Sequence, residues 1–256
     1  MKNWREYLIE AWGLGSFMVA AGIVVTLLES PEYPLQQMIP SVFIRRAIVG
    51  IAMGLTAIAI IYSPWGKRSG AHINPAVTIT FFRLGKISLA DAVGYIVAQF
   101  VGGWIGVLLV AILFGTAFTS PPVNYVVTVP GNGGWLLAAI AEFLLSFSLM
   151  LMVLIVSNSS KIAIFTGLFS GILVATFITF EAPLSGMSIN PARTFASALP
   201  ASIWTDFWLY YFVPPLAMLF AAQIYLRRFS QPKIICTKLC PNSETPCLAV
   251  QCCQHD

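Results

Sequence analysis

The chain carries one short pattern twice, as SGAHINPAVT at residues 69–78 and as SGMSINPART at residues 185–194. The residues of the shared Asn-Pro-Ala motif are Asn74, Pro75, Ala76, Asn190, Pro191 and Ala192. Asparagine is a preferred N-cap residue, and proline suits the first helical position because its missing N–H would be unpaired there. Each copy therefore predicts the start of a short helix, over residues 74–83 and 190–199.

The remainder of the chain is too apolar for an ordinary water-soluble domain. Of its 256 residues, 58% are hydrophobic and 9% are charged, whereas a soluble domain carries roughly 25% charge. A helix needs about 20 apolar residues to cross a bilayer. Blocks of this length occur near residues 7–28, 42–62, 91–114, 135–156, 162–181 and 204–226. The alternation typical of a membrane β-barrel is missing from these blocks, so the sequence predicts an all-α membrane protein with six transmembrane helices and two half-helices.

The repeat predicts two halves of opposite orientation, about residues 4–114 and 135–228. Each half holds two spans, a half-helix and a third span. Because three spans is an odd number, the second half must lie inverted in the membrane. Most lysines and arginines fall on the side of the chain ends. The positive-inside rule therefore predicts cytoplasmic termini for a multi-pass protein of the plasma membrane or cell inner membrane.

The inverted arrangement brings the two Asn-Pro-Ala turns together near the centre of the bilayer. Non-helical backbone at that depth is tolerated only where it is buried in protein or lines a cavity. Each helix N-terminus carries about half an elementary positive charge, so the meeting point repels cations, including hydrated protons. A neutral dipolar molecule can accept hydrogen bonds from the asparagine amides. The constellation contains no nucleophile and no general base, which favours a channel over an enzyme.

Both stretches resemble the signature segments of the aquaporin (major intrinsic protein) family, and the resemblance covers about residues 4–228. It implies a right-handed six-helix bundle with two half-helices, a pore in each subunit, a homotetramer, and no cofactor or metal. The water-channel branch is favoured over the glycerol branch. Thr194 stands where glycerol-type members have Asp, and Tyr210-Tyr211 stand where those members have a Pro-Leu-type pair.

The same resemblance implies a narrow ring of four residues that selects the solute. It would consist of Arg193, Met187, Ile178 and either Met53 or Gly54. Water-restricted members typically have Phe at the helix 2 position and His at the position of Ile178. A ring of three apolar residues and one arginine is less polar, so passage of glycerol, urea or ammonia beside water is an open alternative.

Six residues are expected to lie near the pore or to support it, namely His72, Glu10, Glu142, Gln99, Tyr210 and Tyr211. His72 precedes Asn74 by two residues and could line the pore or be buried in hydrogen bonds. Glu10 and Glu142 occupy equivalent places in the first helix of each half. We expect them to accept backbone N–H groups near the Asn-Pro-Ala turns, with Gln99 in a similar role, because those groups need acceptors away from water. A proton or ion relay is the alternative for the two glutamates.

The tail, residues 229–256, has a different composition and holds every cysteine of the chain. These are Cys236, Cys240, Cys247, Cys252 and Cys253. Their spacing matches no standard zinc pattern. A metal site and palmitoylation of Cys252-Cys253 are alternatives, but a flexible cytoplasmic tail of reduced thiols is favoured.

The expected partners are water or a small neutral solute and membrane lipid. Nucleic acid is not expected, because the basic residues behind the net charge of +4 lie between the apolar blocks and at the chain ends. Two other classes compete with the channel. An active transporter would need titratable residues at the midplane, and an adhesion or scaffolding protein would have an occluded pore.

Overall fold

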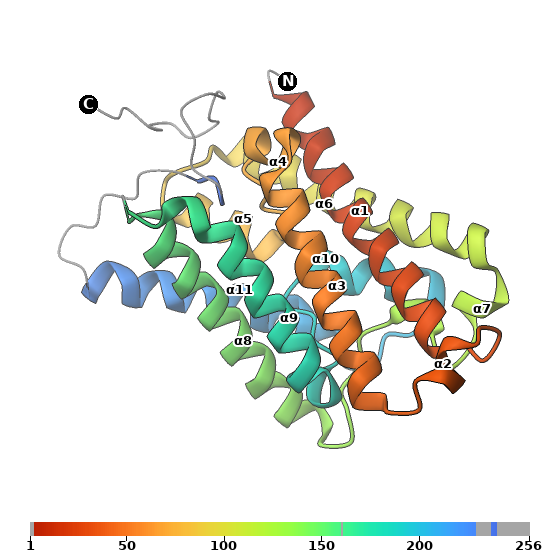
Figure 1. Cartoon of the computed structure of the whole chain (residues 1–256). Helices are drawn as coiled ribbons and strands as arrows, with labels where there is room; N and C mark the ends of the chain where they lie inside the picture. Colours follow the sequence, from red (N-terminus) through yellow and green to blue (C-terminus); the bar gives the residue numbers. More distant parts are fainter. Residues whose placement is uncertain (1–2, 160, 229–236, 240–256) are drawn as a thin grey trace.

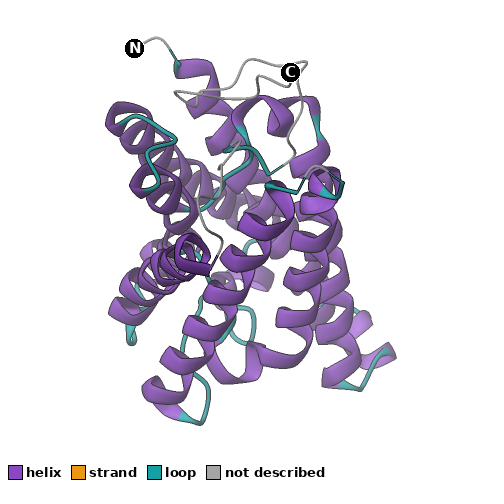
Figure 2. Cartoon of the chain, turned by 90° about the vertical axis from the view of Figure 1, so that its left-hand side faces the viewer, coloured by secondary structure: helices purple, strands orange, loops and turns teal. Residues whose placement is uncertain are grey.

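The computed structural model describes residues 3–159, 161–228 and 237–239, and this part of the chain is almost entirely helical (Figures 1 and 2). The long helices are α1 (Trp4–Glu29), α3 (Val42–Tyr62), α6 (Leu89–Phe114), α8 (Gly134–Ser157), α9 (Thr166–Ser185) and α11 (Phe207–Arg228). The shorter ones are α2 (Leu35–Met38), α4 (Pro64–Ser69), α5 (Pro75–Arg83), α7 (Thr116–Thr119), α10 (Pro191–Ala201) and the 3₁₀ turns η1 (Asn124–Val126) and η2 (Ala163–Phe165). The six predicted spans are confirmed, since six helices have the length and composition to cross a membrane.

One span ends later than the sequence predicts. The expected end at residue 181 lies before Pro183, but α9 continues through that proline to Ser185. A proline inside a helix lacks the N–H that would bond the carbonyl four residues earlier, here the carbonyl of Thr179. The Nε atom of Arg46 on α3 donates to this carbonyl at 2.8 Å. A side chain from the neighbouring helix thus replaces the missing intrahelical bond.

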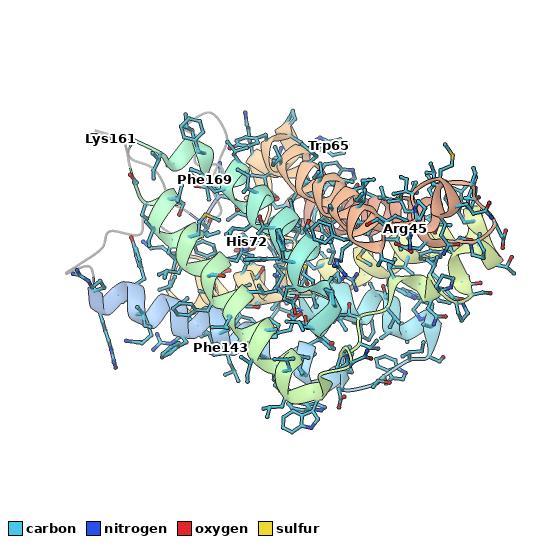
Figure 3. All side chains as sticks on the ribbon, turned by 60° about the horizontal axis from the view of Figure 1, so that its bottom comes forward. Arg45, Trp65, His72, Phe143, Lys161 and Phe169 are labelled. Atoms are coloured by element: carbon cyan, nitrogen blue, oxygen red, sulfur yellow. The ribbon has the colours of Figure 1, made fainter. Side chains whose placement is uncertain are left out.

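The outer surface of the bundle is apolar. Leu55, Ile112 and Leu216 expose 60%, 82% and 60% of their side chains. In Figure 3, His72 lies inside the bundle, whereas Trp65 and Lys161 lie at its edge. An extensive apolar surface marks contact with a membrane or another protein, and the composition of the six helices favours lipid.

Contacts between helix ends define two ends of the bundle. At the N-terminal end, where α1 begins, Arg68 pairs with Glu6 at 2.9 Å, and the hydroxyl of Tyr7 donates to Asp91 on α6 at 2.7 Å. At the opposite end, the guanidinium of Arg45 binds both carboxylate oxygens of Glu29 at 3.0 Å. Successive long helices therefore run in alternating directions.

The two halves interlock through their half-helices. Within each half the first long helix packs against the last, α1 against α6 and α8 against α11. The half-helices cross over: α5 of the first half packs against α11, and α10 of the second half packs against α6. Glycines allow the closest approach, since a Cβ atom at Gly102 would lie 2.1 Å from the carbonyl oxygen of Ala11. The halves thus share one core, with the half-helix N-termini inside it.

Candidate functional site

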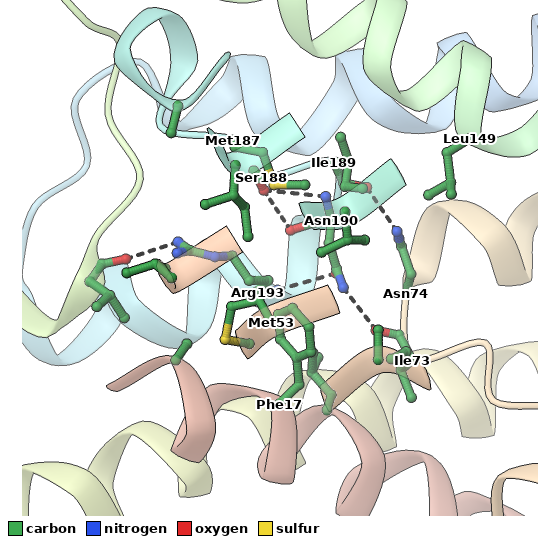
Figure 4. Close-up of a pocket in the computed structure, with 18 of the residues that line it drawn as sticks. Phe17, Met53, Ile73, Asn74, Leu149, Met187, Ser188, Ile189, Asn190 and Arg193 are labelled. Atoms are coloured by element: carbon green, nitrogen blue, oxygen red, sulfur yellow. Dashed lines mark hydrogen bonds between the residues drawn. The ribbon is translucent and has the colours of Figure 1, made fainter. Parts of the chain in front are cut away.

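The two Asn-Pro-Ala turns are bonded directly to each other. As the capping preference predicts, Asn74 Oδ1 accepts from the N–H of Ala76 at 2.9 Å, and Asn190 Oδ1 accepts from the N–H of Ala192 at 3.1 Å. Each amide nitrogen then bonds the opposite loop (Figure 4). Asn74 Nδ2 donates to the carbonyl of Ile189, and Asn190 Nδ2 to the carbonyl of Ile73, both at 2.8 Å.

These bonds leave donors for a molecule in the cavity. An asparagine amide has two N–H groups, and each Nδ2 makes one hydrogen bond within the described residues. Asn74 and Asn190 both line the central cavity. The second N–H of each amide is therefore the group that can bind an acceptor there.

A buried carboxylate organises the loop that leads into each turn. In the first loop, Glu10 accepts from the N–H groups of His72 at 3.0 Å and Ile73 at 2.6 Å. In the second, Glu142 accepts from the N–H groups of Ser188 and Ile189, both at 2.6 Å. Both carboxylates are fully buried. Unpaired backbone N–H groups at this depth would be costly, so the hydrogen bonds expected of the two glutamates are present.

Both loops also share an unusual backbone. Ala71 and Ile73 have φ values of 52° and 41°, and Met187 and Ile189 have φ values of 51° and 50°. Residues other than glycine rarely adopt this left-handed backbone conformation. Alternating left-handed residues turn successive N–H groups toward one acceptor. The bonds to each glutamate thus offset the backbone strain.

Further side chains bond to each glutamate and to the serine of its loop. Ser69 and Ser185 each donate a hydroxyl to the neighbouring glutamate at 2.8 Å. The serine carbonyls accept from Tyr95 on α6 and Tyr210 on α11, both at 2.6 Å. Gln99 Nε2 donates to Glu10 at 2.8 Å, as the sequence suggests. Tyr211, in contrast, is 45% exposed on the outer face of α11.

The central cavity has a volume of about 340 Å³ and runs along the axis of the bundle. Its wall includes Arg193, Met187, Ile178 and Met53, four of the residues predicted for the selective ring. Gly54 is not part of this wall. A Cβ atom at Gly54 would lie 2.5 Å from the carbonyl oxygen of Gly171, so this glycine serves the contact between α3 and α9.

Some wall residues have no signal in the sequence. Phe17 of α1 faces Met53 and Arg193 across the cavity (Figure 4). It is one of many large apolar residues in a spanning helix, and the two faces of α1 have similar composition. For this reason no sequence pattern marks Phe17 as a residue of the cavity wall.

The guanidinium of Arg193 is held by the loop that precedes α8. Its Nη1 atom donates to the carbonyl of Val126 at 2.9 Å and to the hydroxyl of Thr128. Arg193 also belongs to the first turn of α10, where its backbone N–H is capped by Asn190 at 3.2 Å. These contacts keep the charged group against the cavity wall, and neither Val126 nor Thr128 was predicted to take part.

His72 both lines the cavity and is bound at its two ring nitrogens. Nδ1 lies 3.1 Å from the hydroxyl of Thr78, and Nε2 lies 3.0 Å from the carbonyl oxygen of Thr237. A carbonyl only accepts, so Nε2 carries the hydrogen. His72 lies outside the six spanning helices. Burial lowers the pKa of its imidazole, while the nearby Glu10 and the bond to Thr237 act in the opposite direction.

The end of the described chain differs from the flexible tail that the sequence predicts. Thr237, Lys238 and Leu239 are 4%, 1% and 6% exposed. Leu239 joins the buried apolar cluster of the bundle, and this burial is the physical reason for the difference. The five cysteines lie outside the described residues. Within the residues described, no group of three His, Cys, Asp or Glu side chains could hold a metal ion.

Comparison with known proteins places these features in a family. The family model described as "Major intrinsic protein" matches residues 1–225. "Probable aquaporin AqpM" of Archaeoglobus fulgidus is 36% identical over 184 residues, which are 69% of this chain and 74% of that protein. "Aquaporin NIP1-1" of Arabidopsis thaliana is 32% identical over 180 residues, 69% of this chain and 60% of the relative. The match thus spans about three fifths of the plant relative's length.

A solved structure shares the fold. The X-ray structure of the aquaglyceroporin from Plasmodium falciparum aligns with a TM-score of 0.72 and 22% sequence identity. The alignment covers 86% of this chain and 94% of the other. At this identity the likeness establishes the arrangement of helices and half-helices.

Proposed function

This chain belongs to the major intrinsic protein family, and from that premise we propose that it is a passive transmembrane channel, and not an enzyme, for water and other small uncharged solutes. The observation that carries the proposal is the pair of asparagines in the cavity wall, each bonded to a backbone carbonyl of the opposite loop. Two capped helix N-termini meet there, and each amide keeps one N–H for a passing molecule.

The site favours neutral over charged solutes. The aligned peptide dipoles of α5 and α10 place positive partial charge at Asn74 and Asn190. Arg193 adds a full positive charge further along the cavity, and such charges raise an electrostatic barrier against cations. A water molecule whose oxygen accepts from both asparagines cannot accept a proton from the next water. Proton transfer along the water file is interrupted at that point.

The wall around Arg193 supports a solute range beyond water. Met53, Ile178 and Met187 are apolar, and Phe17 adds an aromatic face. One charged donor beside apolar walls suits a molecule with both polar and apolar sides. Glycerol, urea and ammonia are the solutes of this kind that we propose beside water.

The contacts of the two buried glutamates argue against an active transporter. A coupling site needs carboxylate oxygens that can exchange a proton or bind an ion during transport. Glu10 and Glu142 bind two backbone N–H groups each, and losing those bonds would release strained backbone. The proposed role of both glutamates is support of the half-helix loops.

We further propose a homotetramer in a lipid membrane, with the N-terminal end of the bundle in the cytoplasm. The basic residues near that end support the orientation; they are Arg5, Lys67, Arg68, Arg83, Lys86, Lys161, Arg227 and Arg228. The apolar outer faces offer surface for both lipid and neighbouring subunits. Protease accessibility in oriented vesicles tests the orientation, and light scattering of the detergent-solubilised protein tests the subunit number.

The function is tested by stopped-flow measurements on proteoliposomes that contain the full chain, with water, glycerol, urea and ammonia run in parallel. We expect permeability to water above that of bare liposomes. Substituting Ile178→His makes this part of the wall polar. We expect it to lower the permeability to glycerol relative to the permeability to water severalfold, roughly the discrimination that one pocket contact supplies. The matched control Ile178→Val keeps the wall apolar and should preserve the ratio.

The proposal is contradicted if the chain adds no permeability to any of these solutes, either as wild type or as the variant Leu239→Asp.

A further inference from the structure

A segment from beyond the last helix lies at one mouth of the cavity. Thr237, Lys238 and Leu239 are buried at the N-terminal end of the bundle, although α11 already ends at Arg228. Two hydrogen bonds attach this segment to the loop before the first Asn-Pro-Ala turn. The N–H of Leu239 donates to the carbonyl of Gly70 at 3.0 Å, and His72 Nε2 donates to the carbonyl of Thr237 at 3.0 Å.

The loop is shaped to receive this segment. Gly70 has a φ of 99°, which favours glycine. A Cβ atom at Gly70 would lie 3.3 Å from the carbonyl oxygen of Thr237 and 3.4 Å from the Cα atom of Lys238. The absence of a side chain at residue 70 therefore lets the two backbones approach closely enough for the hydrogen bonds.

Leu239 enters the cavity wall itself. It lines the cavity together with His72, Val77, Leu149 and Val153, and it shares one buried apolar cluster with the three aliphatic residues. These residues come from α5, from α8 and from the loop before Asn74, so Leu239 belongs to a part of the wall that is built from several segments. An aliphatic side chain here offers no hydrogen bond to a passing solute.

We propose that Thr237–Leu239 is a plug that closes the N-terminal mouth of the pore and opens it by undocking. This inference rests on the proposed channel function. Docking includes the backbone hydrogen bond from Leu239 to Gly70, the side-chain hydrogen bond from His72 to Thr237 and the burial of Leu239. All of these contacts are noncovalent, so the segment can leave the mouth without breaking a covalent bond. On undocking, His72 Nε2 loses the carbonyl of Thr237 and can donate to water at the same point of the pore.

The test compares full-length variants in proteoliposomes by stopped-flow water permeability. Leu239→Asp places a carboxylate in an apolar mouth, which favours the undocked state. We expect about a fivefold or larger rise in permeability per folded protein, following the shift in population between the two states. Leu239→Ala keeps the segment neutral and should give a smaller rise. The control Leu248→Asp makes the same change in the tail, at a residue outside the described ones.

A second measurement reports docking without transport. Lys238 is 1% exposed, so acylation of its amine in permeabilised vesicles, followed by mass spectrometry, should be slow in wild type. We expect several times faster labelling in Leu239→Asp and unchanged labelling in Leu248→Asp.

The outcomes separate the plug from the channel. Equal permeability and equal Lys238 labelling in wild type and Leu239→Asp overturn the plug and leave the channel function standing. If neither protein conducts any of the four solutes, the channel function fails and the gating role fails with it. A rise in both readouts for Leu239→Asp alone supports the plug.

Discussion

The two Asn-Pro-Ala regions, residues 69–78 and 185–194, are held by the same hydrogen bonds but present different side chains to the cavity. In both, a serine and two backbone N–H groups bind a buried glutamate, and a tyrosine from the last helix of that half binds the serine carbonyl. The residue that follows the motif differs: Val77 in the first region and Arg193 in the second. Both line the cavity, so the pore has one apolar station and one charged station.

The difference separates residues that hold the backbone from residues that meet the solute. The shared contacts satisfy backbone groups of a strained loop that is shielded from water, or hold the glutamate that does so. The positions that differ, such as His72 against Ser188, lie on the side of the cavity. They give the pore two unlike ends: Thr237 of the tail bonds His72 of the first region, and Thr128 of the loop before α8 bonds Arg193 of the second.

The largest loss of stability is expected when the buried glutamate of the second region is replaced. Glu142→Leu leaves the N–H groups of Ser188 and Ile189 without their acceptor. Each buried unsatisfied group costs about 1–3 kcal/mol. We therefore expect the free energy of unfolding to fall by roughly 3–5 kcal/mol, the range for breaking a buried charged network. Thermal unfolding in detergent, followed by circular dichroism, measures it.

The same change in the first region should be milder, which makes Glu10→Leu the matched comparison. Gln99 Nε2 already touches Glu10, and Gln99 Oε1 has no hydrogen-bond partner within the described residues. A rotated Gln99 amide can therefore offer an acceptor to the first loop. Pro214 occupies the equivalent place on α11, counted from Tyr95 and Tyr210. Equal losses of unfolding free energy in Glu10→Leu and Glu142→Leu would contradict this role of Gln99.

The next largest effect is expected when both regions carry the same residue after the Asn-Pro-Ala motif. Arg193→Val gives the second region the residue type of Val77 and removes a positive charge that faces the cavity. We expect glycerol flux to rise about tenfold and protons to leak, because the electrostatic barrier and the steric constriction both fall. Solute flux by stopped flow and a pH-sensitive dye inside the vesicles measure the two effects.

Arg46→Gln is the control for this change, since it removes the charge of another arginine in the cavity wall and keeps an amide that can donate to the carbonyl of Thr179. It should alter glycerol flux less than Arg193→Val does. A similar rise in both variants would mean that the ring around Arg193 is not the selective part of the wall.

The smallest effect concerns His72, which has Ser188 as its counterpart. Because burial lowers its pKa below the ordinary value of 6.5, the imidazole is neutral at pH 7, and water permeability should stay constant between about pH 7 and pH 8. The unfolded chain binds a proton at higher pH than the folded chain, so His72 should make the protein less stable as the pH falls below 6.5. Stopped flow and thermal unfolding across this range measure both, and a permeability step centred above pH 7 that His72→Gln removes would contradict the assignment.

The sequence by itself determined the elements of this fold. An asparagine before a proline caps a helix through its own neighbours, and an apolar run of about 20 residues suits a bilayer regardless of what surrounds it. Both are local properties. The two half-helices, the six spans and the inverted relation between the halves could be predicted for that reason. The paired Glu10 and Glu142 followed from the repeat together with the need of buried N–H groups for acceptors.

Only the tertiary structure decided which side chains face the cavity. Met53 and Gly54 are neighbours in the chain, and the packing of α3 against α9 turns one toward the cavity and the other toward Gly171. Phe17, Val126 and Leu239 reach the pore from a spanning helix, a loop and the tail, with no local pattern to distinguish them from residues around them. Their positions depend on contacts between segments far apart in the chain. The sequence therefore predicts that a pore is present, and the packing of distant segments determines what lines and closes it.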